Sequence, residues 1–168
     1  MAALKNFEDL ASFALHLGAV DLAVRHQMRT GLEKALVIIE TDAKEQIGHY
    51  QEAAPGFPAW AALAESTEAK KARNGAPAGA PLLEHGGLYA SIKHTVESDE
   101  AGIAGATDPT MVFHEFGTSK MPPRPVFGPA VVKNREAIQK VLGHALVQGI
   151  VGGQVSAAGG YFGGDIKS

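Results

Sequence analysis

The longest periodic feature of this chain is a row of apolar residues, spaced three or four apart, between Val20 and Ile47. The row consists of Val20, Val24, Met28, Leu32, Leu36, Ile39, Ala43 and Ile47. Because such steps keep side chains on one face of an α-helix, the row predicts a single helix from about Val20 to about Tyr50. A helix this long must bury its apolar face against something large, so we expect a sheet or a neighbouring subunit beside it.

Two shorter helices are predicted near this row. Asn6 is placed to cap a helix that runs to Leu17 and ends at Gly18. A further helix over residues 59–73 fits between prolines, and Trp60 is expected to pin it to the body of the protein.

An alternating pattern predicts a β-hairpin in the middle of the chain. Ile92, His94 and Val96 alternate with polar or charged neighbours, which is the period of a half-buried strand. Residues 101–106 are expected to return as the second strand, and their small side chains indicate close backbone packing. A turn or a short helix follows over residues 108–116.

The predicted fold class is α+β, with a small, mainly antiparallel sheet flanked by a long N-terminal helix and a C-terminal helix. The C-terminal helix is predicted to start near Pro129, which suits a first turn, and to end at Gly152 and Gly153. A chain of 168 residues favours one domain, which we place over residues 1–151.

The remaining residues, 152–168, form a predicted glycine-rich C-terminal arm. Its aromatic pair, Tyr161 and Phe162, could dock the arm on a neighbouring subunit. An arm that folds back onto its own domain is equally compatible with the sequence.

Composition excludes several classes of protein. The chain contains no cysteine, which removes disulfides, thiolate metal sites and cysteine nucleophiles. Its formal net charge of -3 argues against nucleic acid as the main ligand. No run of about 18 apolar residues is present, and the first residues do not read as a secretory signal, so we expect neither a membrane span nor secretion.

The most distinctive motif covers residues 114–130 and reads HEFGTSKMPPRPVFGPA. Four prolines fall within eight residues from Pro122, which makes the segment stiff and extended. Gly117 is predicted to take a positive φ and to end the preceding helix. We expect Glu115 to form an ion pair with Arg124 and so to lock the loop to the helix end.

This segment resembles the Glu-Phe-Gly-Thr-x-x-x-x-Pro-x-Arg-Pro-Phe signature of tailed-phage neck and tail-completion proteins, the virion morphogenesis families of Mu-like and lambdoid phages. Residues 60–67 resemble the Trp-x-x-Leu-x-x-x-Thr element of the Mu-like branch, and residues 81–92 its Pro-Leu-x-x-x-Gly-x-Leu-x-x-Ser-Ile element. The resemblance covers the chain up to about Ile150. It departs from the family pattern at Val126-Phe127 and at residues 85–87.

The resemblance implies a structural virion protein rather than an enzyme, with no cofactor. Such proteins act at the head–tail junction, in neck or tail completion or as tail terminators, and form a ring, commonly six-fold, that caps the tail tube and joins it to the connector. The implied partners are copies of itself, the tail tube protein and a head-completion or connector protein. DNA would only pass through as cargo, and no membrane is involved. The implied location is the virion, after synthesis in the host bacterial cytoplasm.

The related tail-terminator fold is an α+β domain with a sheet flanked by helices, so the resemblance agrees with the predicted fold class. The motif residues to which it assigns structural or interface roles are Trp60, Leu88, Ser91, Ile92, Glu115, Phe116, Gly117, Thr118, Pro123, Arg124, Pro125, Phe127 and Pro129.

A second class stays open: a small metal- or nucleic-acid-binding module, or an enzyme, encoded with phage morphogenesis genes. Its candidate residues are His85, His94 and His114 with Asp108 for a metal, and Ser119 or Ser91 for a hydrolase. No sequence motif joins these residues. The basic cluster of Lys70, Lys71 and Arg73 is predicted to be a solvated helix face rather than a nucleic-acid contact.

Overall fold

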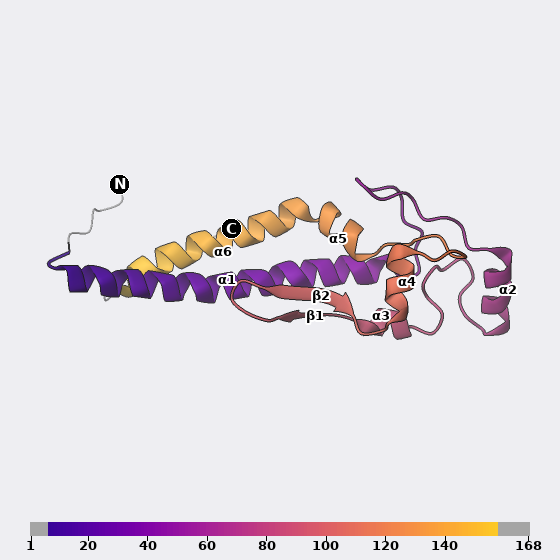
Figure 1. The fold of residues 1–168 in the computed structure, drawn as a ribbon, viewed down its shortest axis with the longest axis horizontal. Coiled ribbons are helices and arrows are strands. Elements are labelled where there is room, and N and C mark those ends of the chain that lie inside the picture. Colours follow the sequence, from indigo (N-terminus) through magenta and orange to yellow (C-terminus); the bar gives the residue numbers. More distant parts are fainter. Residues whose placement is uncertain (1–6, 158–168) are drawn as a thin grey trace.

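The computed structural model describes residues 7–157, with side chains described as far as Gly152, as an elongated α+β fold (Figure 1). Helix α1 (Leu10–Gln46) runs along much of the molecule, and α6 (Arg135–Ala157) returns beside its N-terminal part. A hairpin of two antiparallel strands packs on the remaining part of α1. The predicted α+β class is therefore confirmed.

Helix α1 is one continuous helix of 37 residues rather than the two predicted helices. Asp9 caps it: its carboxylate accepts a hydrogen bond of 2.7 Å from the backbone N–H of Ser12, and the Ser12 hydroxyl faces the Asp9 backbone N–H in return. Gly18 does not end the helix, since it lies inside it with open space around its Cα. Asn6, the predicted cap, lies outside the described residues.

Helices α1 and α6 approach each other through small residues. A Cβ atom added at Gly31 would lie 2.6 Å from the Ala145 Cβ, and one added at Gly149 would lie 2.5 Å from the Val24 Cα. These distances mean that the two helices touch almost backbone to backbone. The apolar row of α1 thus finds two partners, the predicted sheet and the C-terminal helix.

The hairpin is formed by β1 (Ile92–Val96) and β2 (Gly102–Ala106), as predicted. Ile92 pairs with Ala106 at one end, and its side chain is fully buried. A Cβ at Gly102 would lie 2.6 Å from the Leu36 Cδ1, so a glycine lets β2 lie close to α1 without a shift of Leu36. The small residues of the second strand therefore allow the close packing that the sequence indicated.

Three short helices lie near and beyond the end of α1 that carries the core (Figure 1). Helix α2 (Glu65–Arg73) is shorter than predicted, because the chain around Trp60 is extended rather than helical. Helix α3 (Gly87–Ser91) leads directly into the first strand. Of the turn and the short helix predicted over residues 108–116, the structure has the helix, α4 (Thr110–Phe116).

The predicted C-terminal helix is two helices. Helix α5 (Phe127–Lys133) begins two residues before Pro129, and the chain bends at Asn134 before α6 begins. Asn134 donates from its side-chain amide to the carboxylate of Asp42 at 2.5 Å, so the bend is held by a contact with α1. At its other end α6 continues through Gly152 to Ala157, beyond the predicted stop.

The core lies where the end of α1 meets the hairpin, α4 and α5. Its buried members are Ala43, Ile47, Trp60, Ile92, Met111, Val126 and Ala130. Tyr161 and Phe162, the predicted docking residues of the arm, lie outside the described residues. Within residues 7–157, no helix combines the length and the apolarity needed to cross a membrane.

Candidate functional site

The motif of residues 114–130 forms a tight loop between α4 and α5. Gly117 has a φ of 71°, as predicted, and a Cβ there would lie 2.9 Å from the Met121 carbonyl oxygen. The backbone N–H of Thr118 donates to that same oxygen at 2.8 Å, and its hydroxyl accepts from the N–H of Lys120 at 3.2 Å. The loop is therefore closed by its own backbone and requires glycine at its first position.

The predicted ion pair between Glu115 and Arg124 is wrong. Each residue instead binds backbone groups. One carboxylate oxygen of Glu115, Oε1, accepts hydrogen bonds of 2.8 Å from the N–H groups of both Val126 and Phe127. These groups are at the N-terminus of α5, where an anion is stabilised by unpaired N–H donors and by the helix dipole.

The guanidinium of Arg124 reaches the chain that precedes α2. Its Nη2 donates to the carbonyl oxygens of Ala61 at 3.0 Å and Ala62 at 3.3 Å, and its backbone N–H donates to the His114 oxygen at 2.6 Å. The residue is only 5% exposed. It therefore ties two of the three family-like elements together, although its partner is not an acid.

Trp60 and Gln46 complete the attachment of the loop. The indole Nε1 of Trp60 donates to the Pro125 carbonyl oxygen at 3.3 Å. The side-chain amide of Gln46 donates to the Val126 carbonyl oxygen at 3.1 Å. Trp60 is buried, as predicted, but it acts on the proline loop as well as on the core.

The other predicted motif residues divide into a buried and an exposed set. Buried or half-buried are Leu88, Ser91, Ile92, Pro125, Phe127 and Pro129. Exposed are Phe116, Thr118 and Pro123. Phe116 is 82% exposed, which is unusual for a large apolar side chain at the end of a helix.

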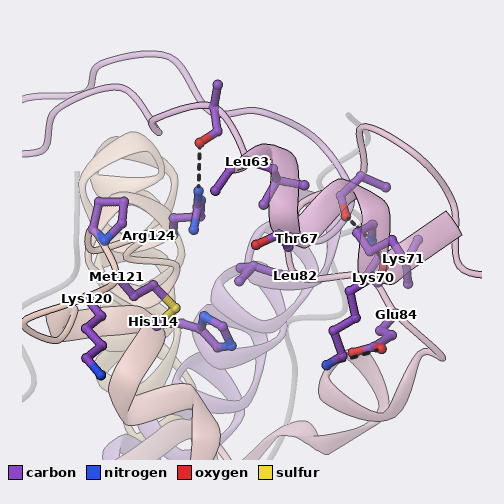
Figure 2. Close-up of a pocket in the computed structure, with 15 residues that line it drawn as sticks. Leu63, Thr67, Lys70, Lys71, Leu82, Glu84, His114, Lys120, Met121 and Arg124 are labelled. Carbon is purple, nitrogen blue, oxygen red and sulfur yellow. Dashed lines mark hydrogen bonds and ion pairs between the residues drawn. The ribbon is translucent and has the colours of Figure 1, made fainter. Parts of the chain in front are cut away.

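A cavity of about 310 Å³ lies beside the loop, between α2, the end of α4 and the segment around residues 80–84 (Figure 2). His114 and Met121 reach into it from one side, and Thr67 and Leu82 face them from the other. The sequence did not indicate this cavity, because its walls come from four separated segments.

The basic cluster on α2 is only partly the solvated face that was predicted, because Lys70 and Arg73 are exposed and Lys71 is not. Lys71 is buried, and its Nζ donates to the carbonyl oxygens of Ala80 at 2.9 Å and Leu83 at 2.5 Å. Lys70 lies 3.7 Å from a carboxylate oxygen of Glu84. These lysines hold the segment of residues 80–84 against α2.

A charged cluster that sequence reasoning missed joins the hairpin to α1. The Nε2 of His94 lies 3.0 Å from Glu33 Oε1, and its Nδ1 is hydrogen-bonded to Glu40. These contacts raise the pKa of His94, and the hydrogen bond with Glu33 has the larger effect, followed by the one with Glu40. Lys44 also contacts Glu40, at 2.5 Å. The signal was available in the seven-residue spacing of the two glutamates, which places them on one face of α1.

Of the two serines in the hydrolase hypothesis, Ser91 donates from its hydroxyl to the Leu88 carbonyl oxygen at 2.7 Å, and Ser119 is exposed. Within residues 7–157, no three histidine, aspartate or glutamate side chains are grouped so that they could hold a metal ion. Burial, and then the nearby Arg124, lower the pKa of His114, with a smaller opposing effect from Asp108.

Several large apolar side chains lie exposed in two parts of the molecule. The first group lies on the N-terminal part of α1 and on α6, a region called the helix-pair surface below, and consists of Leu10, Leu15, Leu17, Leu22, Leu146, Val147, Ile150 and Val151. The second is the α4 surface, which consists of Val112, Phe113 and Phe116. Surfaces of this kind on a folded chain are typical of contacts with another polypeptide.

Comparisons with known proteins add no relative: no protein-family model, no curated protein and no solved structure matches this chain.

Proposed function

We propose that this protein is a structural subunit of a tailed-phage virion that acts in neck or tail completion, or as tail terminator, at the head–tail junction. Copies of the chain would form a ring, commonly six-fold in the family it resembles, that caps the tail tube and joins it to the connector. The proposal rests on the resemblance of residues 60–130 and on the exposed apolar surfaces of the folded chain.

The way the motif residues are used supports a scaffold role. Glu115 and Arg124 bind backbone groups, and Trp60 binds a carbonyl of the loop. The side-chain hydrogen bonds of these three residues all go to backbone groups, which is what a role in holding the chain requires. The loop is therefore built to fix the path of the chain between α4 and α5.

The observation that carries the proposal is the exposure of apolar side chains on the helix-pair surface. Leu15 is 77% exposed and Leu22 is 70% exposed, on a helix that otherwise packs against α6. Burying such side chains contributes about 1.5 to 3 kcal/mol each. A ring needs one surface of each subunit to bind a different surface of the next. The helix-pair surface and the α4 surface provide two separate candidates.

The first test is the molar mass of the full chain in solution, measured by size-exclusion chromatography with light scattering. We expect a ring-sized species, alone or on mixing with purified tail tubes. Leu15→Ser with Leu22→Ser should reduce it to a monomer while helicity by circular dichroism is kept. Val131→Ser, on an exposed position of α5 outside both surfaces, is the matched control and should leave the mass unchanged.

A chain that stays monomeric both alone and with tail tubes would contradict the ring. The role in the particle has its own test, in which the gene is deleted from a phage that encodes the chain. We expect filled capsids and finished tails that do not join. Normal joining and infection without the protein would overturn the proposal.

A further inference from the structure

The cavity beside the proline loop carries positive charge that the described chain does not neutralise. Glu84 is the one acidic residue in its described lining, and it is already bound by Asn74 at 2.9 Å and faced by Lys70 at 3.7 Å. Lys71 is held by two carbonyl groups. Arg124 and Lys120 therefore line the cavity without an ion pair among the described residues, and His114 lines it with them.

Arg124 is the most telling of these groups. It is buried, and no carboxylate of the described residues lies within ion-pair distance of its guanidinium. Its Nε is buried and makes no hydrogen bond within that part of the chain. A buried cation without a counter-ion is costly by several kcal/mol, so an anion from outside would stabilise this arrangement.

His114 also carries a ring nitrogen without a hydrogen-bond partner among the described residues. This nitrogen, Nδ1, is buried. Figure 2 shows its ring directed toward the middle of the cavity, with the thioether of Met121 beside it. The two residues that carry these unsatisfied nitrogens thus line one cavity.

Apolar side chains form part of the remaining walls. Leu63 and Leu82 face Met121 across the cavity, and Thr67 adds a hydroxyl. A volume of about 310 Å³ is at the lower end of the range for small-molecule sites. One guanidinium and one imidazole suit an anion of single charge, and the walls suit a short apolar stem.

We propose that this cavity is a binding site for a carboxylate on a short apolar stem, with Arg124 as its cation and His114 as a second donor. The carboxylate could come from an aspartate or glutamate side chain of another polypeptide or from a free organic acid, which share this chemistry. The site does not depend on ring formation, so it can fail or hold independently of the function proposed above.

The test uses the full chain labelled with 13C at its methionine methyl groups. Isovalerate and its neutral isostere isovaleramide are titrated separately at constant ionic strength, and the Met121 methyl signal, assigned with Met121→Leu, is followed by NMR. We expect a saturable shift with the acid and none with the amide, together with a rise in the pKa of His114. No saturable shift with either compound, or equal shifts with both, would overturn the proposal.

Variants then locate the charge. Arg124→Lys should weaken isovalerate binding at least tenfold, and His114→Gln should weaken it by a smaller factor, whereas Lys140→Gln, on α6, is the matched control and should have no effect. If Arg124→Lys does not fold, the comparison of acid and amide in the unaltered chain still decides the question.

The two sources are separated with acetyl-Leu-Glu-Leu-amide and acetyl-Leu-Gln-Leu-amide. A Met121 shift with the glutamate peptide alone identifies a polypeptide side chain as a ligand of the site. A shift with isovalerate but with neither peptide identifies a free organic acid. Identical shifts with both peptides would contradict recognition of the carboxylate.

Discussion

The indole of Trp60 donates a hydrogen bond of 3.3 Å to the carbonyl oxygen of Pro125, across 65 positions of sequence. This contact joins the first and the last of the three family-like elements, and both residues are buried. The tryptophan therefore stabilises the proline loop as well as the core.

Trp60→Phe removes this hydrogen bond and keeps most of the apolar ring. We expect a loss of about 1 to 3 kcal/mol in the free energy of unfolding, because the Pro125 oxygen is left without its donor and the smaller ring fills less space. Urea unfolding followed by circular dichroism measures it. Tyr89→Phe, at an exposed aromatic position, should change stability by less than about 0.5 kcal/mol. Equal stability of the two variants would refute the role given to Trp60.

Glu115→Ala removes the carboxylate that caps the N-terminus of α5 from 11 positions earlier in the sequence. Two backbone N–H groups lose their partner, so we expect a loss of about 1 to 3 kcal/mol in the free energy of unfolding. Glu136→Ala is a matched control, since Glu136 is an exposed acid in the first turn of α6. The cap hypothesis fails if both substitutions cost the same.

Gly149→Ala and Gly143→Ala are a matched pair on one helix. A methyl group at Gly149 would meet the backbone of Val24, whereas one at Gly143 meets nothing within 4 Å. We expect Gly149→Ala to force α1 and α6 apart and to cost about 1 to 3 kcal/mol. Gly143→Ala should instead stabilise the protein by about 0.5 to 1 kcal/mol, through higher helix propensity. Thermal unfolding of both variants checks the prediction, and a gain in stability for Gly149→Ala would contradict the close packing.

The cluster of His94 with Glu33 and Glu40 predicts a dependence of stability on pH. Because the pKa of His94 is raised in the folded protein, its stabilisation is complete below the unfolded pKa of about 6.5 and is lost as the pH rises through the folded pKa. The pKa of Glu40 is lowered, by Lys44 first and then by His94, so its own contribution is lost in acid as the pH falls through that lowered value. Both contributions are present together between about pH 4.5 and 6.5.

His94→Gln isolates this effect. We expect the difference in free energy of unfolding between the original chain and the variant to be larger at pH 5.5 than at pH 8.5. The comparison is needed because His114 acts in the opposite direction: its lowered pKa makes its contribution fall in acid. A difference that is constant over this range would show that the ring is not charged in the cluster.

Local patterns predicted the elements well where periodicity and burial coincide. Ile92, His94 and Val96 point inward as their alternation indicated. Helix limits were less well predicted, because they depend on tertiary contacts. The bend at Asn134 is held by Asp42, and the helix continues through Gly18, where no other part of the described chain lies within 4 Å of a Cβ position.

The candidate site was predicted only in part for a similar reason. Charge suggested that Glu115 and Arg124 attract each other, but sequence does not display the backbone N–H and carbonyl groups that compete for them. The cavity near His114 needed the fold itself, since its walls lie up to about sixty positions apart in the chain.

The unbroken course of α1 has a mechanical consequence. At about 1.5 Å per residue, its 37 residues form a rod about 55 Å long. The helix-pair surface lies toward one end of this rod, and the core and the proline loop lie at the other (Figure 1). A neighbouring subunit that binds the N-terminal end of α1 would therefore also set the position and the orientation of the proline loop at the other end.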